Sequence, residues 1–328
     1  MDKIIGIGNA LIDVLAVLED ETTLQKVGLP KGSMQLIDEK KLEEINNLFS
    51  TMPTHLATGG SAANTILGLA CMGAKTGFIG KIGEDNYGNF FKENCIENDI
   101  EEKLLVSDLP SGVASTFITP DGERTFGTYL GAAAALKAED LTPDLFKGYT
   151  YLYIEGYLVQ DHTMILRAIE LAKEAGLQIC LDLSSYNIVE NDLEFFTLLV
   201  NKYADIVFAN EEEAKALTGK EPAEALNEIS RMCSVAIVKI GSQGSLIKKG
   251  TCTTHVPAIE VEKVVDTTGA GDYFSAGFLY GLTCGYSLEK CAQIGSILAG
   301  NVIQVVGTNL SKEKWDEIKL NINTILPE

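Results

Sequence analysis

Residues 264–274, with the sequence VVDTTGAGDYF, combine a glycine turn with an aspartate in a way that suits phosphoryl transfer. Apolar runs flank the turn at 258–265 and 274–282, and they predict the order strand, turn, helix. Such a turn directs unpaired backbone N–H groups and the positive end of a helix dipole to one point. The carboxylate of Asp272 falls in the first helical turn, where it can take a proton from an alcohol. The alternative is an aspartate that only complements the helix dipole.

A second glycine-rich segment, residues 58–70, begins a predicted helix of small and apolar residues. Gly59 and Gly60 precede this helix, and Asn64 is the only strongly polar side chain in its first turns. One amide on an apolar helix suggests recognition of a hydroxyl group, whereas the alternative is a buried capping amide. Asp13 follows the first predicted strand in an apolar setting, and a binding role and an ordinary loop turn are equally open for it.

From about residue 148 onward, short apolar strands alternate with amphipathic helices. The predicted strands are 151–154, 179–183, 206–209 and 235–239, and the predicted helices are 161–175, 190–202, 211–217 and 222–232. This alternation predicts right-handed crossovers and a parallel sheet covered by helices on both faces. Ligands of such sheets bind beyond the carboxyl ends of the strands, where Asp182, Asn210, Glu213 and Gly241 fall.

Three segments carry patterns that suit the binding of a nucleotide or of its magnesium ion. Asn210 and Glu213 are three residues apart at a helix start, and their oxygens suit the water shell of Mg²⁺, although an acidic first turn is common. A strand that ends at Lys239 leads into a turn with Gly241 and Gly244, a pattern that allows close passage of a nucleotide but that ordinary turns share. Asn301 is the clearest polar candidate in the helical region 285–307.

The composition excludes several classes of protein. The chain has 328 residues, a formal net charge of −20 and a pI near 4.6, which argues against nucleic acid as a partner. Seven cysteines without a Cys-x-x-Cys pair indicate reduced thiols in a cytoplasmic protein. Three widely separated histidines make a histidine metal cluster improbable. No run reaches transmembrane length, and the N-terminal apolar run lacks the cationic segment of a signal peptide, so we expect no membrane partner.

Residues 104–126 have β character with many polar positions, which suits a sheet exposed on one side. Residues 120–123 predict a hairpin turn. Arg124 follows this turn, and a solvated hairpin charge is the more frequent role of a lone arginine.

Together these motifs resemble the ribokinase-like (PfkB) family of carbohydrate and nucleoside kinases over essentially the whole chain. The resemblance rests on Asp-Thr-Thr-Gly-Ala-Gly-Asp-x-Phe at 266–274, Gly-Gly-x-x-x-Asn at 59–64, the glycines and aspartate of 80–88, and Asn-x-x-Glu at 210–213. Within the family, residues 8–13, 121–131 and 153–158 look most like bacterial adenosine-kinase-like members. A sugar kinase for ribose, fructose or a similar monosaccharide is the close alternative.

The resemblance implies a role for each candidate residue. Asp272 would take the proton from the substrate's primary hydroxyl, and the backbone N–H groups of Gly269, Ala270 and Gly271 would form an anion hole. Substrate contacts would come from Asp13, Gly59, Gly60 and Asn64, with Arg124 reaching phosphate. ATP would be bordered by Lys239, Gly241, Gly244 and Asn301. Asn210 and Glu213 would hold Mg²⁺ through water, and Asp266 and Thr268 stand where some members bind potassium.

The resemblance also implies a three-layer αβα, Rossmann-like core with a mainly parallel sheet and a small β-sheet lid. The core would comprise residues 1–13, 38–103 and 131–328, and the discontinuous lid residues 14–37 and 104–130. Lid closure would exclude water from the reaction, and the protein would be a monomer or a homodimer. A nicotinamide oxidoreductase is disfavoured because Leu11 stands where a dinucleotide fingerprint needs its third glycine. A non-catalytic sugar-binding protein is disfavoured by the intact glycine turn beside Asp272.

Overall fold

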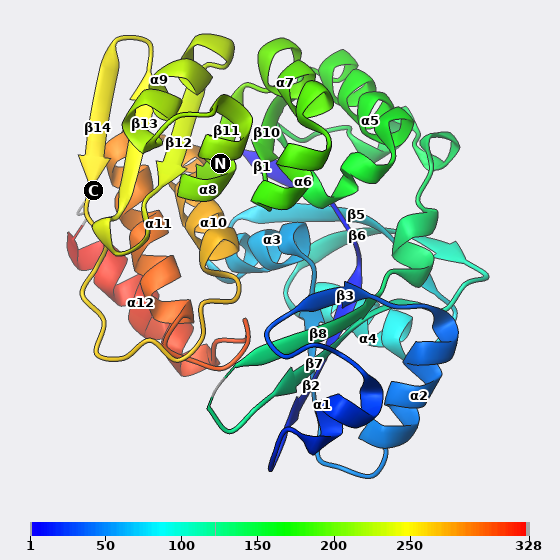
Figure 1. The fold of residues 1–328 in the computed structure, drawn as a ribbon. Coiled ribbons are helices and arrows are strands. Elements are labelled where there is room, and N and C mark those ends of the chain that lie inside the picture. Colours follow the sequence, from blue (N-terminus) through cyan, green and yellow to red (C-terminus); the bar gives the residue numbers. More distant parts are fainter. Residues whose placement is uncertain (1, 122, 326–328) are drawn as a thin grey trace.

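A computed structural model describes residues 2–121 and 123–325, and it contains a large mixed sheet between two layers of helices (Figure 1). The large sheet has nine strands in the order β14-β13-β12-β11-β10-β9-β1-β5-β6. Their bounds are β1 Lys3–Ile7, β5 Lys75–Gly83, β6 Ile100–Ser107, β9 Tyr151–Glu155, β10 Gln178–Asp182, β11 Ile206–Asn210, β12 Val235–Lys239, β13 Ser245–Lys249 and β14 Cys252–Val256. The pairs from β12 to β6 are parallel, and β13 and β14 add an antiparallel edge. The predicted α/β core with a mainly parallel sheet is confirmed.

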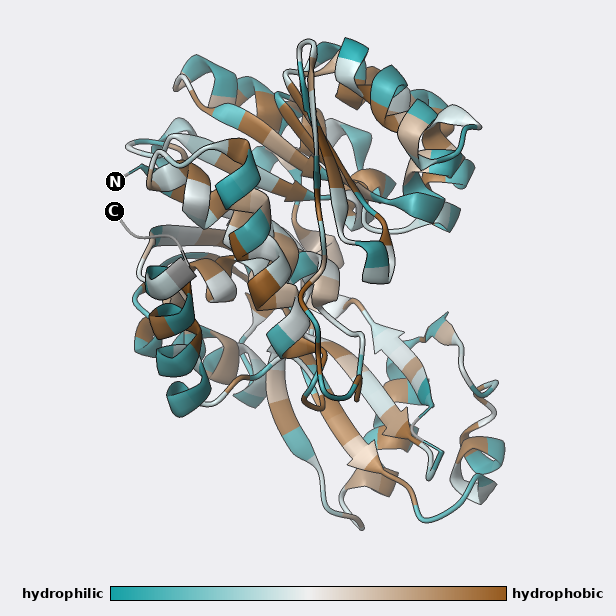
Figure 2. Cartoon of the chain, turned by 90° about the vertical axis from the view of Figure 1, so that its left-hand side faces the viewer, coloured by the Kyte–Doolittle hydropathy of each residue, from teal (hydrophilic) through white to brown (hydrophobic). Residues whose placement is uncertain are grey.

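Two apolar clusters, one on each face of the large sheet, hold the helices. Successive strand residues alternate between them: Ile4 packs in one cluster, and Ile5 and Ile7 pack in the other. The first face carries α3 Ser61–Cys71, α4 Asn86–Glu97, α10 Ala270–Thr283, α11 Leu288–Val302 and α12 Lys312–Ile325. The second face carries α5 His162–Glu174, α6 Tyr186–Asn191, α7 Leu193–Lys202, α8 Glu211–Thr218 and α9 Pro222–Met232. Figure 2 shows the brown strands enclosed between helices whose outer sides are largely teal.

A smaller sheet lies to one side of this core, at the lower right in Figure 1. Its five strands have the order β3-β8-β7-β2-β4, with bounds β2 Leu11–Val17, β3 Met34–Leu36, β4 His55–Gly59, β7 Gly112–Ile118 and β8 Arg124–Tyr129. Helices α1 Thr22–Val27 and α2 Glu39–Phe49 accompany this sheet. Phe49 of α2 packs against Phe117 of β7, with ring centroids 4.9 Å apart.

The small sheet differs from the expected lid in two strands. The segment 104–107 belongs to β6, which pairs with β5 in the large sheet, so it is part of the core. Residues 55–59, expected in the core, form β4 and pair with β2 at the edge of the small sheet. Both strands were misplaced because strand composition does not reveal which sheet a strand joins. The hairpin turn predicted at 120–123 includes Gly122, which lies outside the described residues.

The strand predicted before the glycine turn is absent from the described structure. Residues 257–267 are irregular, and near their end the backbone N–H groups of Val265 and Asp266 donate to the Ile303 carbonyl after α11, at 2.8 and 3.1 Å. The antiparallel strands β13 and β14 were not predicted from the sequence. The helix predicted at 190–202 is divided into α6 and α7 at Asp192. Among the described residues, no helix is both long and apolar enough to cross a bilayer.

Candidate active site

A cavity of about 810 Å³ opens beyond the carboxyl ends of β10, β11 and β12, beside the start of α10. Its polar lining residues include Ser61, Asp182, Asn210, Glu213, Lys239, Thr268 and Asp272. Its apolar lining comes from Ala258, Ile259, Val261, Val264, Phe274, Ala299 and Ile303. A volume of this size accommodates a nucleotide-sized ligand, and the apolar wall suits an aromatic base.

Asp272 lies at this cavity in the first turn of α10, held by two side chains of α3. Its carboxylate accepts hydrogen bonds from Ser61 Oγ at 2.6 Å and from Asn64 Nδ2 at 2.9 Å. Burial raises the pKa of Asp272 to about 6, against the opposing effect of these two hydrogen bonds. The carboxylate is therefore mostly ionised at neutral pH and already oriented. Ser61 was not predicted as a site residue, although its position after Gly60 at the helix start was a usable signal.

The glycine turn directs the start of α10 toward the same cavity. Gly269 caps the helix with a φ of +75°, and a Cβ atom there would lie 2.6 Å from the side chain of Thr308, so glycine is required. Gly269, Ala270 and Gly271 all line the cavity. The Ala270 N–H donates to the Thr267 carbonyl at 3.2 Å, so that amide also closes the turn.

A buried ion pair stands beside the turn. Lys239 Nζ lies 3.3 Å from Asp182 Oδ2, and the two side chains are 14% and 4% exposed. A Cβ atom on Gly271 would lie 3.0 Å from Lys239 Nζ, which places the ammonium against the turn. Burial lowers the pKa of Lys239, but the nearby carboxylates of Asp182 and Glu213 outweigh this effect and raise it, so Lys239 is charged.

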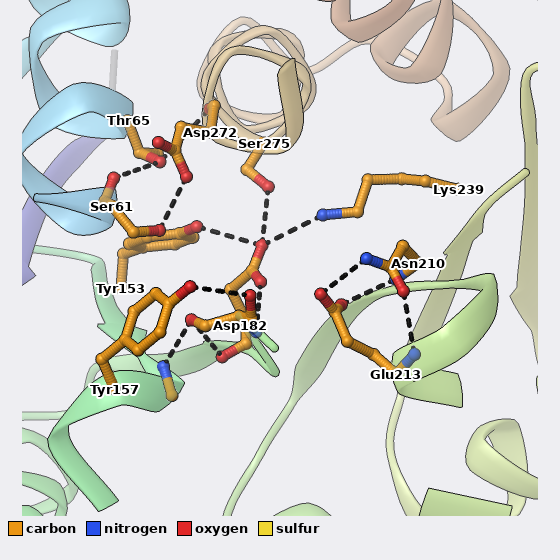
Figure 3. A network of polar contacts seen from close by, with 12 residues as sticks. Ser61, Thr65, Tyr153, Tyr157, Asp182, Asn210, Glu213, Lys239, Asp272 and Ser275 are labelled. Atoms are coloured by element: carbon orange, nitrogen blue, oxygen red, sulfur yellow. Dashed lines mark hydrogen bonds and ion pairs between the residues drawn. The ribbon is translucent and has the colours of Figure 1, made fainter. Parts of the chain in front are cut away.

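Asp182 is the centre of the contacts drawn in Figure 3. Besides Lys239, it contacts the hydroxyl groups of Tyr153 at 3.2 Å and Ser275 at 3.3 Å (Figure 3). The sequence placed Asp182 at a strand end but assigned it no role. An acidic residue that ends an otherwise apolar strand was the available signal.

Asn210 and Glu213 lie together at the start of α8, where they form a reciprocal cap. Both carboxylate oxygens of Glu213 accept from Asn210, one from the backbone N–H and one from Nδ2, each at 2.7 Å (Figure 3). Burial raises the pKa of Glu213 to about 7. Among the described residues no group of three or more acidic, histidine or cysteine side chains forms a metal cage. The donor set therefore fits Mg²⁺ only through water, with Glu213 and Asp182 among the carboxylates that line the cavity.

Gly241 and Gly244 border the cavity, and both have positive φ, +55° and +100°. A Cβ atom on Gly244 would lie 2.7 Å from the backbone of Pro257 and Ala258, so this glycine lets the two segments pass closely. Asn301 is placed differently. Its Nδ2 donates to the Ile297 carbonyl of its own helix at 2.8 Å, and its neighbours Ala299 and Gly300 line the cavity instead.

Asp13, Gly59 and Gly60 meet where β2 pairs with β4. Asp13 lies within β2, not at a strand end, and a Cβ atom on Gly59 would overlap its carboxylate. Gly60 has a φ of +97°, and a Cβ atom there would overlap the Asn9 carbonyl. Burial raises the pKa of Asp13 to about 7; Arg124 lowers it, and Asp272 and Asp266 raise it further. Asp13, Gly59, Gly60 and Asn64 are not among the residues that line the cavity, and Asn64 is linked to it by its hydrogen bond to Asp272.

Arg124 is not a solvated hairpin charge. It extends from β8 of the small sheet to Asp266, with Nη2 2.6 Å from Oδ2, and the two side chains are 11% and 5% exposed. Its Nη1 lies 3.5 Å from the Thr268 hydroxyl. The Asp266 carboxylate also accepts from the backbone N–H groups of Thr268 at 3.1 Å and Gly307 at 2.8 Å. Because N–H donors and a guanidinium surround this carboxylate, Asp266 and Thr268 do not fit a potassium ion.

Glu155, at the end of β9, is a buried group that the sequence did not single out as a site residue. Its carboxylate, 1% exposed, accepts from Asn9 N at 2.9 Å, Asn9 Nδ2 at 2.7 Å and Ala62 N at 2.7 Å. Burial raises its pKa to about 7. Glu155 thereby ties the connection between β1 and β2 to the first turn of α3, which carries Ser61 and Asn64.

Comparisons with known proteins identify related sequences and structures. The model of the pfkB family of carbohydrate kinases matches residues 34–315. A probable sugar kinase from Rhizobium etli superposes with a TM-score of 0.86 at 34% identity, covering 98% of this chain and 99% of the other. An adenosine kinase from Sinorhizobium meliloti gives 0.85 at 35% identity, covering 96% and 98%. A 5-dehydro-2-deoxygluconokinase from Listeria monocytogenes is 27% identical over 86% of this chain and 92% of its own length.

Proposed function

Because the chain belongs to the pfkB family of carbohydrate kinases, we propose that it transfers a phosphoryl group from ATP to the primary hydroxyl of an adenosine-type nucleoside. Membership makes the protein a carbohydrate or nucleoside kinase, and a kinase of this family uses ATP, typically with Mg²⁺. The observation that carries the proposal is the position of Asp272. One helix start directs it at the cavity, and Ser61 and Asn64 of another helix hold its carboxylate.

Asp272 is the general base in this proposal. Its pKa of about 6 leaves it ionised at neutral pH, yet closer to the operating pH than that of an ordinary aspartate. The hydrogen bonds from Ser61 and Asn64 fix the carboxylate, so that little reorganisation is needed when it accepts the proton of the attacking hydroxyl.

In this proposal, the negative charge that develops on the transferred phosphoryl group lies beside the start of α10 and the ammonium group of Lys239. Gly269, Ala270 and Gly271 line this place, and Lys239 lies against Gly271. Fixed donors at a helix start stabilise such charge without reorganisation. Bound Mg²⁺, held through water near Asn210 and Glu213, would neutralise charge on the phosphates. Gly241, Gly244 and the apolar wall around Ile259 would border the nucleotide.

In this proposal, residues of β2 and α3 position the acceptor alcohol beside Asp272. Asp13 and Asn64 are the polar side chains there, and Gly59, without a side chain, accommodates the Asp13 carboxylate. A carboxylate can accept from two neighbouring hydroxyls at once, and this orients the third hydroxyl toward Asp272. A ribose with its 2′, 3′ and 5′ hydroxyls meets this requirement.

A monosaccharide is the second candidate, since the probable sugar kinase from Rhizobium etli is about as similar to this chain as the adenosine kinase from Sinorhizobium meliloti. Among the aromatic residues Phe117, Phe126, Tyr129 and Tyr157, which could pack against a purine, Tyr157 lines the cavity. Phe117 is buried against Phe49 and contributes to the core. The nucleoside assignment therefore depends on the motifs shared with adenosine kinases.

A substrate panel tests the proposal. Purified protein with ATP and Mg²⁺ is given adenosine, other nucleosides, ribose, fructose and 5-dehydro-2-deoxygluconate, and ADP release is measured. We expect turnover with adenosine and none with 5′-deoxyadenosine, which keeps the ribose diol but lacks the accepting hydroxyl. 5′-Deoxyadenosine should instead compete with adenosine. Phosphorylation of a monosaccharide alone would establish the alternative.

A further inference from the structure

We propose that the guanidinium of Arg124 supplies, at Asp266, the positive charge that the family resemblance assigns to a monovalent cation, so that the enzyme works without potassium. The inference deepens the proposed kinase function and rests on it. It starts from the disagreement between the expected cation site at Asp266 and Thr268 and the contacts that these residues make.

The first step is that the ligands a cation would need are already engaged. Asp266 Oδ2 accepts from Gly307 N and pairs with Arg124, and Oδ1 accepts from Thr268 N. The Thr268 hydroxyl oxygen lies 3.5 Å from Nη1, the other terminal guanidinium nitrogen of Arg124. Alkali and alkaline-earth ions bind through several free oxygens, whereas here the carboxylate is surrounded by N–H donors.

The second step is electrostatic. The Arg124 and Asp266 side chains are almost entirely removed from water, so their attraction is weakly screened. Potassium entering beside Asp266 would meet the guanidinium at short range and would be repelled. An arginine stays charged at and well above neutral pH, so the charge that Arg124 brings to Asp266 does not depend on pH in that range.

The third step links this charge to the reaction. Asp266 and Thr268 lead directly into the glycine turn at Gly269, and Asp266 also holds the backbone of Gly307, next to Thr308, which packs on Gly269. Arg124 comes from the small sheet, the sheet that also carries Asp13. The position of that sheet therefore decides whether the turn receives its positive charge. Potassium in solution would act at any time, whereas Arg124 acts only when the small sheet is in place.

The wild-type protein provides the first test. Turnover with adenosine and the thermal midpoint are measured in chloride salts of potassium, sodium and N-methyl-D-glucamine at one ionic strength. We expect the three salts to give the same turnover and the same midpoint. A potassium-specific rise in either quantity would overturn the inference. The midpoint needs no substrate, so it still decides the matter if the kinase reaction itself is not found.

The second test is chemical rescue of Arg124→Ala. We expect turnover to fall by roughly 10²–10³-fold, as for loss of one fixed charged group near the reacting phosphate. Low millimolar guanidinium chloride should restore part of this loss, because the free ion fits the space left by the side chain. Arg167→Ala is the matched control, since Arg167 forms an exposed pair with Glu170 on α5 and should neither lose turnover nor respond. A folded Arg124→Ala protein that ignores guanidinium would contradict the proposal; if the variant does not fold, the salt comparison on the wild type decides.

Discussion

Asn64 Nδ2 donates a 2.9 Å hydrogen bond to the carboxylate of Asp272, across 208 residues of sequence. This contact joins the helix that follows the Gly59-Gly60 pair to the helix that follows the Gly269–Gly271 turn. Ser61 makes the same connection one helical turn earlier. The residues proposed for acceptor recognition and the turn proposed for phosphoryl transfer therefore share one carboxylate, and the predictions below depend on this arrangement.

Replacing the base should remove catalysis while leaving substrate binding largely intact. We expect Asp272→Asn to lower turnover by about 10²–10⁴-fold, because the amide cannot accept the proton of the hydroxyl. Steady-state kinetics and calorimetric titration with adenosine separate the two effects. Asp316→Asn, an exposed position on α12, is the control and should behave as wild type. Near-wild-type turnover of Asp272→Asn would exclude this residue as the base.

The rate should depend on pH through the same carboxyl group. Burial raises the pKa of Asp272 to about 6, and only the ionised form can accept a proton. We therefore expect kcat/KM to rise with pH between about 5 and 7 and then to level off. Initial rates in a buffer series at constant ionic strength measure this profile. A flat profile across pH 6 would mean that the group does not titrate in the free enzyme.

Stability should depend on pH in the opposite direction. Burial raises the pKa of Asp13, Glu155 and Glu213 to about 7, above the unfolded values of 3.8 to 4.5. The folded protein therefore binds more protons than the unfolded chain between these values. The stabilisation is complete below pH 4 and is lost as the pH rises through 7. Urea unfolding at pH 5, 6 and 7 should show a free energy of unfolding that decreases with pH, and an increase would contradict the buried placement of these carboxyls.

Glu155 should be important for the placement of α3. In Glu155→Gln, the side-chain NH₂ group faces backbone donors, so one buried N–H group loses its acceptor, at a cost of about 1–3 kcal/mol. Because α3 carries Ser61 and Asn64, we expect KM for the acceptor to rise as well. Urea unfolding and kinetics measure the two effects. Glu170→Gln, at an exposed position on α5, should change neither.

Loss of the ammonium at the turn should affect the chemical step and the nucleotide. We expect Lys239→Met to lower kcat by roughly 10²-fold, since a preorganised charge at the transferred group is removed. The change also leaves Asp182 without its cation, so the protein should lose stability. Lys249→Met, at an exposed position on β13, serves as the control. An unchanged kcat would show that Lys239 has only a structural role.

Local patterns in the sequence determined the types of element and the order in which they occur. The apolar runs 3–7, 151–154 and 235–239 predicted buried strands, because a strand covered by helices on both faces has a nearly continuous apolar sequence. Glycines 60 and 269 marked helix starts, since a positive φ is costly for other residues. The sequence therefore predicted much of the cavity lining, namely the strand ends at Asn210 and Lys239 and the glycine turn.

The tertiary structure alone decided which of these elements meet. Nothing local in residues 55–59 or 100–107 indicates which sheet they join, or that the N–H groups of Val265 and Asp266 bond to the end of α11 and not to a strand. The contacts of Ser61 with Asp272, Glu155 with Ala62, and Arg124 with Asp266 likewise join residues that are distant in the chain. Such partners are selected by the packing of whole helices and sheets, and this depends on all the buried side chains at once.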